Sequence, residues 1–190
     1  MDRSATASLV ALGAKLVELP RWNCCGAVFS LADDDLLRLI APIRNLIRVM
    51  EQGEQKVVTA CSMCYNTLAR ANLVIREDEE KRNTINSFME EEPDYNGEVD
   101  VIHLLNYLGN EIGWDKVREN VKIPLKGLKV APYYGCTLLR PLSVAIEPPE
   151  NPTLLKEFIG ALGATVVDFP ASTLCCSCLL YTSDAADELD

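Results

Sequence analysis

The chain carries its cysteines in a repeated pattern. A Leu-Gly-Ala stretch that starts at Leu12 leads into an adjacent cysteine pair, and a matching stretch that starts at Leu162 leads into a second pair. Each copy also has a cysteine group that the other lacks, a Cys-x-x-Cys after the first pair and a single cysteine before the second. The cysteines of this pattern are Cys24, Cys25, Cys61, Cys64, Cys136, Cys175 and Cys176. Thiolates bind zinc and iron–sulfur clusters, so the repeat predicts a duplicated metal-binding unit.

The two copies complement one another. Superposing them gives one site of five cysteines, of which the first copy has four and the second copy has three. By this repeat, the remaining cysteines would lie before Met1 and after Asp190. We therefore expect a protein cut at both ends, with two incomplete units.

The number of thiols separates the candidate metal sites. A Cys-x-x-Cys motif alone is compatible with zinc, with thioredoxin-like redox chemistry or with an iron–sulfur cluster. One zinc ion is satisfied by four ligands, so a site of five cysteines exceeds what zinc needs. A cluster can bind adjacent cysteines through different iron atoms, and the pattern therefore favours iron and sulfide. A zinc-binding structural module is the alternative.

Structural disulfides are less compatible with the sequence. Eight cysteines in a 190-residue chain without a secretory signal favour metal or redox chemistry over a disulfide framework. With 48% hydrophobic residues, a chain of this size buries a core without covalent bridges. A bridge between adjacent cysteines is also a strained ring.

Charge and hydropathy exclude two further classes of protein. The net charge of −10 argues against binding to nucleic acid, which needs clustered Lys and Arg. The most apolar helical segment, 36–50, is interrupted by Arg38, Pro42, Arg44 and Arg48, and no segment approaches the roughly 20 apolar residues of a membrane span. Because no signal peptide is visible either, we expect a cytoplasmic protein without a membrane span.

Short β-rich segments precede every cysteine group, and helical segments alternate with them. Strands are expected at 15–19, 56–60, 129–134 and 165–169. Helices are expected at 3–13, at 36–50 with the acidic residues 33–35 in its first turn and Gly53 closing it, around 101–108, and from Asn151-Pro152 to Leu162. This alternation predicts an α/β fold with parallel sheets, whose ligands collect at the carboxyl ends of the strands. The cysteines of each copy should therefore converge at one sheet edge.

Three other features have mainly structural interpretations. His103 lies in an apolar, helical context with no cysteine near it, so a satisfied side chain is expected rather than a metal ligand. The acidic segment 76–97 is typical of a helix that ends in a solvated turn, with a docking patch as the alternative. Trp22 either shields the first cysteine pair from water or is an ordinary core aromatic.

Together these motifs resemble the cysteine-rich CCG domain family, and within it the B subunit of the CoB–CoM heterodisulfide reductases. Besides the cysteine pattern, the resemblance rests on Pro-Leu-Lys-Gly-Leu-Lys-Val-Ala-Pro-Tyr-Tyr-Gly-Cys at 124–136 and on the motifs at 140–141 and 150–152. It covers residues 1–177. It implies two pseudo-symmetric α/β lobes with parallel sheets flanked by helices, each lobe carrying a noncubane [4Fe–4S] cluster held by five cysteines.

The ligand positions of the family carry over to the cysteines of this chain. Those that match the first cluster are Cys24, Cys25, Cys61 and Cys64, and those that match the second are Cys136, Cys175 and Cys176. The second copy departs from the family pattern at Ser177, where the first has Gly26. Because neither ligand set is complete, we expect this chain to be inactive as it stands.

The resemblance also implies an activity and partners. The reaction is the two-electron reduction of a small-molecule disulfide to two thiols, with electrons from a ferredoxin-like iron–sulfur subunit and a flavin-binding subunit. Cluster iron can accept each sulfur as the disulfide splits, so no histidine relay is needed, in keeping with the single histidine of the chain. An electron-transfer subunit of a quinone-linked dehydrogenase is the alternative function.

The expected domain boundaries follow from the repeat. We place a first CCG domain at 1–97, a connector at 98–128 and a second CCG domain at 129–177. Residues 178–188 resemble the translation of a sequencing adapter, and a native acidic tail is the alternative. We therefore do not expect residues 178–190 to be native and do not assign Cys178 as a ligand.

Overall fold

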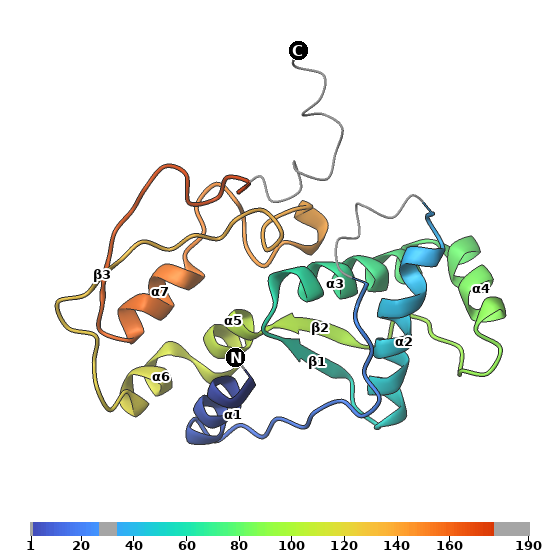
Figure 1. The fold of residues 1–190 in the computed structure, drawn as a ribbon, viewed down its shortest axis with the longest axis horizontal. Coiled ribbons are helices and arrows are strands. Elements are labelled where there is room, and N and C mark those ends of the chain that lie inside the picture. Colours follow the sequence, from blue (N-terminus) through green and yellow to red (C-terminus); the bar gives the residue numbers. More distant parts are fainter. Residues whose placement is uncertain (1, 27–33, 177–190) are drawn as a thin grey trace, which may run out of the picture.

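A computed structural model describes residues 2–26 and 34–176 of the chain. Within these ranges the chain forms two small parallel sheets with helices packed around them, so the predicted α/β class is confirmed. In Figure 1, α2 and α3 flank one sheet and α4 lies beyond them at one end of the molecule, while α7 and α6 lie at the other end. We call the segment from α2 to β2, with the loop of Cys24 and Cys25 before it, the first unit. We call the segment from β3 to β4, with the loop of Cys175 and Cys176 after it, the second unit.

The first unit is built on two adjacent parallel strands, β1 (Lys56–Thr59) and β2 (Asp100–His103). They pair in register from Lys56 opposite Asp100 to Thr59 opposite His103. The helices of this unit are α2 (Leu37–Glu51), α3 (Ser62–Glu77) and α4 (Glu79–Phe88). Helix α3 follows β1 directly and packs on both strands and on α2. The end of β1 therefore delivers the Cys-x-x-Cys motif to the carboxyl edge of this sheet.

The helix predicted around 101–108 is wrong in its first part. Residues 100–103 form β2, and helical structure starts only with α5 (Leu104–Asn106), which continues as the π-helix η2 (Tyr107–Ile112). The β-branched Val101 and Ile102 suit a strand, and β1 offers a partner that satisfies their backbone groups. Part of the expected connector therefore supplies the second strand of the first sheet.

The second unit repeats this arrangement with shorter strands. Strands β3 (Lys129–Val130) and β4 (Thr165–Val166) pair in parallel, and α7 (Leu154–Ala161) packs beside β4. The strands predicted at 129–134 and 165–169 thus exist but end early. Pro132 and Pro170 lack the backbone N–H that would donate a hydrogen bond to a neighbouring strand. After each short strand the backbone therefore leaves the sheet as a loop.

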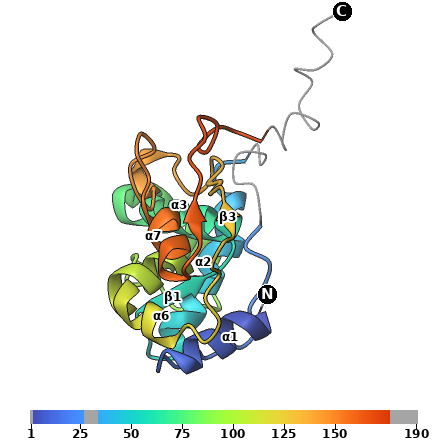
Figure 2. The ribbon, with the colours of Figure 1, turned by 90° about the vertical axis from the view of Figure 1, so that its left-hand side faces the viewer.

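The first helix, α1 (Asp2–Ala11), packs in a hydrophobic cluster separate from the core of the first unit. Its buried Leu9, together with Leu12, joins a cluster with Leu108, Val117 of α6 (Trp114–Asn120) and Ala161 of α7. Figures 1 and 2 both show α1 beside α6. The strand predicted at 15–19 is wrong, because no strand within the described ranges lies alongside this segment to pair with its backbone.

Two helices begin with caps that differ from those predicted. Asp34 lies before α2 rather than in its first turn, and its Oδ1 accepts hydrogen bonds from the amides of Leu36 and Leu37, each at 2.8 Å. Asp33 lies outside the described residues. Helix α7 begins at Leu154, two residues later than Pro152, and the Glu147 carboxylate accepts from its first amides. The predicted end of α2 is confirmed: Gly53 adopts φ +75° and closes the helix.

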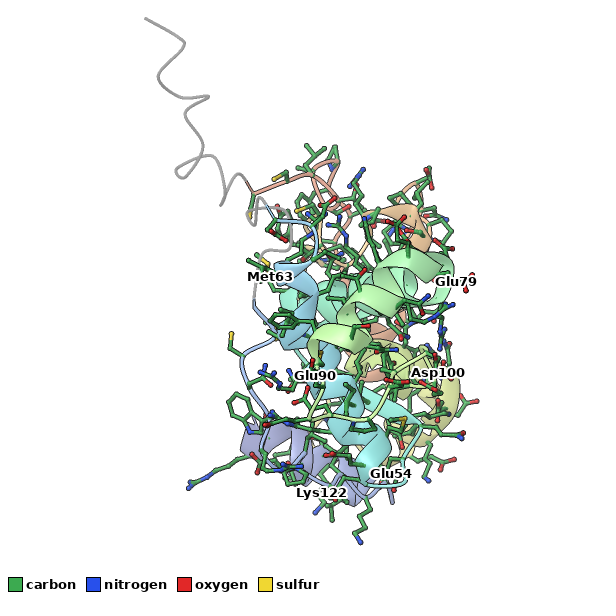
Figure 3. The ribbon with its side chains drawn as sticks, turned by 90° about the vertical axis from the view of Figure 1, so that its right-hand side faces the viewer. Glu54, Met63, Glu79, Glu90, Asp100 and Lys122 are labelled. Carbon is green, nitrogen blue, oxygen red and sulfur yellow. The ribbon has the colours of Figure 1, made fainter. Side chains whose placement is uncertain are left out.

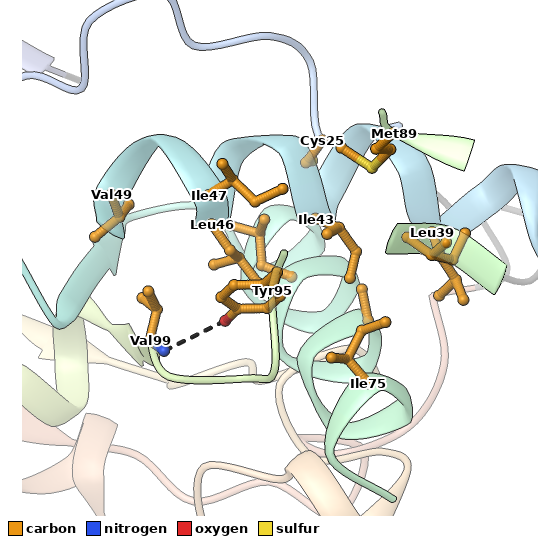
Figure 4. Close-up of a cluster of buried hydrophobic side chains, with 13 residues drawn as sticks. Cys25, Leu39, Ile43, Leu46, Ile47, Val49, Ile75, Met89, Tyr95 and Val99 are labelled. Carbon is orange, nitrogen blue, oxygen red and sulfur yellow. Dashed lines mark hydrogen bonds between the residues drawn. The ribbon is translucent and has the colours of Figure 1, made fainter. Parts of the chain in front are cut away.

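The core of the first unit lies between α2, α3 and α4. Ile43, Leu46 and Ile75 are fully buried, and each such side chain contributes about 1.5–3 kcal/mol of hydrophobic free energy. Tyr95 is also fully buried, and its hydroxyl accepts a hydrogen bond from the Val99 amide (Figure 4). No helix in the described ranges is long and apolar enough to cross a membrane.

Candidate functional site

The thiols of Cys25 and Cys64 meet in the first unit. Cys25 lies in the loop before α2, Cys64 lies in the first turn of α3, and their sulfur atoms are 3.1 Å apart. The Cys25 side chain is only 5% exposed and packs in the core cluster of this unit, and Cys64 is half-buried. A loop and a helix that are distant in sequence therefore bring two of the predicted ligands together.

Cys61 belongs to the same group. Burial raises the pKa of the Cys64 thiol well above its usual range, and the hydrogen bond and charge of Cys25, followed by the charge of Cys61, raise it further. Sulfurs that oppose one another's ionisation become thiolates readily only beside a cation. The group formed by Cys25, Cys61 and Cys64, which we call the first thiol group, is thus suited to a positively charged metal.

Cys61 itself is placed by the end of β1. It occupies the position before α3 with extended backbone angles, φ −104° and ψ 124°. In Figure 3, Met63, which lies two residues after Cys61, is at one end of the unit. Glu54, which precedes β1, is at the other end. The first thiol group therefore lies at the carboxyl edge of the sheet, where ligands of parallel sheets collect.

A pair of asparagines holds the loop that carries the first cysteine pair. The backbone N–H of Asn23 donates to Asn45 Oδ1 at 3.0 Å, and Asn45 Nδ2 donates to the backbone carbonyl of Asn23 at 2.9 Å. Asn23 Nδ2 in turn donates to the Ala41 carbonyl of α2 at 3.0 Å. This clamp fixes the loop on α2 and turns Cys25 into the core.

The backbone conformation explains why a glycine follows the first cysteine pair. Gly26 adopts φ +87°, a left-handed conformation in which an L side chain is strained by roughly 1 kcal/mol or more. The corresponding Ser177 of the second copy lies outside the described residues.

Cys24 is exposed, as Cys61 is, but it does not share the thiol contacts of Cys25, Cys61 and Cys64. Its side chain is exposed, whereas Cys25 is buried. Within the described part of the chain, its thiol forms no hydrogen bond with Cys25, Cys61 or Cys64. The structure therefore brings together three of the four predicted ligands closely and leaves Cys24 at the surface beside them.

The second copy forms a separate thiol group. Burial raises the pKa of Cys136, and the charge and hydrogen bond of Cys175, followed by the charge of Cys176, raise it further. Cys136 is half-buried, while Cys175 and Cys176 are exposed. We call these residues the second thiol group. All three predicted ligands of this copy lie within electrostatic reach of one another.

Tyr133 joins the two loops that carry the second thiol group. Its hydroxyl donates to the carbonyl of Leu174 at 2.7 Å, and its ring stacks on Phe169 with centroids 6.3 Å apart. Loss of contact with water raises its pKa, and the charges of Cys176 and Cys175 add to this. Its ring and hydroxyl thus tie the Cys136 loop to the segment before Cys175.

Two further hydrogen bonds cross between the same loops. The Tyr134 amide donates to the Ser172 carbonyl at 2.8 Å, and the Arg140 guanidinium donates to the Thr173 carbonyl at 3.1 Å. With Tyr133, they attach the loop after β3 to the loop after β4 at three points. The relative positions of Cys136 and the Cys175-Cys176 pair therefore depend on this attachment.

The donors of both groups are thiols, a ligand type that suits an iron–sulfur group. Across residues 2–26 and 34–176, no three His, Cys, Asp or Glu side chains converge closely enough to hold one metal ion. A cluster of several irons is larger than one ion, and its iron atoms can each bind a different thiol. The cysteines that would hold it are those of the first and second thiol groups, with Cys24 beside the first.

The remaining sequence features are structural. His103 ends β2, is 9% exposed, and its Nδ1 accepts from the Leu105 amide at 3.3 Å, so the expectation of a satisfied histidine is confirmed. Trp22 is 61% exposed and donates to Glu18, so its interpretation as a core aromatic is wrong. In the acidic segment, Glu92 forms an ion pair with Arg44 of α2 at 2.6 Å, while its neighbour Glu90 lies on the surface (Figure 3).

Sequence reasoning missed three buried polar residues near the thiols. Asn45 and Asn66 are each 7% exposed and Asn72 is 4% exposed, and all three make hydrogen bonds to the backbone of distant segments. Asn72 interrupts the apolar stripe of α3 between Leu68 and Ile75, and a polar residue in such a stripe signals a buried hydrogen bond. No comparable signal marks Asn66.

Comparison with known proteins agrees with this geometry. Residues 2–69 and 130–189 match the cysteine-rich domain family CCG. The chain is 38% identical over 176 residues to the 8-methylmenaquinol:fumarate reductase membrane anchor subunit of Wolinella succinogenes, covering 92% of this chain and 60% of the relative. It is 30% identical over 178 residues to the B subunit of the ferredoxin:CoB-CoM heterodisulfide reductase of Methanosarcina mazei, covering 93% of this chain and 59% of the relative.

The chain therefore spans about 60% of the length of these relatives. The family match covers both thiol groups and more than half of the chain. It includes the loop of the first cysteine pair, the start of α3 and the segment from β3 to the second pair. The chain belongs to the CCG cysteine-rich domain family and is homologous to the B subunit of the heterodisulfide reductases.

Proposed function

We propose that the chain is part of the iron–sulfur catalytic subunit of a heterodisulfide reductase-type complex. The observation that carries this proposal is the presence of two separate thiol groups, one in each copy of a duplicated unit. In this proposal Cys24, Cys25, Cys61 and Cys64 hold a first noncubane [4Fe–4S] cluster, and Cys136, Cys175 and Cys176 hold part of a second. The domain boundaries at 1–97, 98–128 and 129–177 belong to the same proposal, although β2 of the connector pairs in the first sheet.

The proposed reaction is the reduction of a disulfide. Its sulfur–sulfur bond breaks, two electrons and two protons are taken up, and two thiols leave. Bound iron and sulfide would supply the electrons one at a time and accept sulfur. The protein would contribute the ligands, the buried surroundings of Cys25 and Cys64, and the loop attachments around Cys136. Electrons would come from a ferredoxin-like iron–sulfur subunit and a flavin-binding subunit in the cytoplasm.

Anaerobic incorporation of iron and sulfide tests the ligand assignment. We expect incomplete loading of this chain, and higher loading in a version extended at both ends with the cysteine groups that the repeat predicts. The extended protein should then oxidise reduced viologen dye only when a heterodisulfide such as CoM-S-S-CoB is added. Stoichiometric zinc without sulfide would instead support a structural zinc module.

A second candidate function is an electron-transfer subunit that works with a quinone-linked enzyme. It is favoured by the 38% identity to the 8-methylmenaquinol:fumarate reductase subunit, which exceeds the 30% identity to the heterodisulfide reductase subunit. In that case the loaded protein should be reduced by a menaquinol analogue and should leave the heterodisulfide intact. The two assays therefore distinguish the two functions on the same preparation.

A further inference from the structure

Asn66 connects the two thiol groups. It lies on α3 two residues after Cys64, and its side chain is 7% exposed. The single nitrogen Nδ2 donates to the carbonyl of Thr137 at 2.8 Å and to the carbonyl of Arg140 at 2.7 Å. Thr137 directly follows Cys136. One amide group thus links the helix that carries Cys64 to the turn that carries Cys136.

The turn that Asn66 binds is otherwise held by few backbone bonds. Its own hydrogen bonds run from the Leu139 amide to the Cys136 carbonyl at 3.1 Å and from the Ile146 amide to the Leu138 carbonyl at 2.9 Å. It is neither helix nor strand at these residues, so its carbonyls depend on side-chain donors. Both side-chain N–H groups of Asn66 donate to the same turn. The attachment therefore fixes the orientation of this turn relative to α3 as well as its distance from α3.

Apolar packing encloses this attachment. Tyr65, the neighbour of Asn66, packs in a buried cluster with Tyr134, Leu138 and Leu139. Figure 1 shows the start of α3 running towards the segment that contains η3 (Leu142–Val144), and these two elements are in contact. Both hydrogen bonds are partly buried, so breaking them costs free energy that water only partly returns to the two carbonyls.

The same helix provides a matched comparison. Asn72 lies on α3, is 4% exposed, donates through Nδ2 to the Val99 carbonyl at 2.8 Å and accepts from the Tyr95 hydroxyl. Its partners lie within the first unit. Asn66 and Asn72 are therefore buried asparagines of one helix, and only Asn66 reaches the Cys136 turn.

We infer that Asn66 is a positioning residue that sets the placement of the second thiol group relative to the first. This inference rests on the proposed function, in which both groups serve one reaction. Misplacement of reacting groups by about 1 Å can lower a rate on the order of a hundredfold, so a rigid two-point attachment between the groups has a direct functional consequence.

The test compares Asn66→Leu, Asn66→Gln and the control Asn72→Leu. Hydrogen exchange is measured at the amides of Leu139 and Ile146, together with the rate at which iodoacetamide labels Cys136. Loss of the two bonds should speed exchange and labelling on the order of tenfold in Asn66→Leu. Asn66→Gln keeps both N–H donors and should restore part of the protection. Asn72→Leu should speed exchange at Val99 and leave the Cys136 turn unchanged.

A spectroscopic measurement links this attachment to the metal groups. In the extended protein loaded with iron and sulfide, Asn66→Leu should alter the magnetic interaction between the two reduced centres in the EPR spectrum at unchanged iron content, and Asn72→Leu should not. Unchanged exchange and labelling in Asn66→Leu, or equal acceleration in Asn72→Leu, would overturn the inference. Failure of the extended wild-type protein to take up iron and sulfide contradicts the proposed function instead, and the exchange comparison still tests the role of Asn66.

Discussion

The sulfur atoms of Cys25 and Cys64 lie 3.1 Å apart, although the two residues are 39 positions apart in the chain. A disulfide bond is about 2.05 Å long, so these thiols are reduced but close enough to be joined by a small movement. Their proximity comes from the core of the first unit, which holds Cys25 between α2 and α3. Whether these two thiols can form a disulfide should therefore depend on whether a metal group is bound at the site.

We expect oxidised glutathione to join Cys25 and Cys64 in the metal-free chain. Two thiols give one disulfide, and the glutathione disulfide is reduced to two thiols. Bound iron and sulfide should prevent the reaction, because the sulfurs are then committed to metal. Peptide mass spectrometry after alkylation measures the bond. A Cys24–Cys25 bridge, or equal oxidation with and without metal, would contradict the ligand assignment.

Replacing Cys176 with Ser should remove the metal of the second thiol group. A hydroxyl is a poor ligand for iron–sulfur chemistry, and because Cys176 is exposed the free energy of unfolding should change by no more than about 0.5 kcal/mol. Iron and sulfide content and low-temperature EPR of the extended protein measure the loss. An unaltered cluster signal in Cys176→Ser would mean that this cysteine is not a ligand.

Tyr133→Phe should loosen the second thiol group without unfolding the protein. The ring can still stack on Phe169, while the hydrogen bond to the Leu174 carbonyl is lost. We expect Cys175 to be alkylated about two- to tenfold faster, the range that corresponds to one net hydrogen bond. Tyr133→Leu removes the stacking as well and should exceed this effect. The idea fails if both variants label at the wild-type rate.

Stability should fall as the pH drops below about 6.5, the ordinary pKa of histidine. Burial lowers the pKa of His103, and its bond with the Ala60 backbone only partly opposes this. The unfolded chain therefore binds a proton at a pH where the folded chain does not, so acid favours unfolding and stability is constant above this range. His103 is the only histidine. Denaturation at about pH 7 and about pH 5.5 should show the loss in wild type and not in His103→Gln.

The hydrogen bonds of the buried Tyr95 hydroxyl should contribute more to the free energy of unfolding than a hydrogen bond at the surface. It donates to Asn72 Oδ1 at 2.7 Å and accepts from the Val99 amide at 3.3 Å. Tyr95→Phe leaves both partners buried without it and should lower the free energy of unfolding by about 1–3 kcal/mol. A double-mutant cycle with Asn72→Ala should give a coupling of about 0.5 kcal/mol or more. Additive effects would show that the two side chains act independently.

Much of the architecture could be predicted because it depends on patterns of hydrophobic and polar residues within short segments. The strand at β1, the helices α1 and α2, and the parallel pairing of both sheets follow from local hydrophobic periodicity and from the alternation of strands with helices. The prediction failed at 101–103 and at 15–19. In both places the outcome depends on whether a partner strand lies alongside, which no local pattern contains.

The cysteine types and spacings by themselves determined the duplicated unit, the family and the choice of thiol chemistry, because ligand identity is a property of residues in order along the chain. Only the tertiary structure decided which thiols meet, leaving Cys24 exposed and Cys25 against Cys64. It also decided how the two groups are held together, through Asn66 and a turn 71 residues further along the chain. Such contacts arise where a buried polar group must find a partner, and the partner is set by how the elements pack, not by their sequence neighbours.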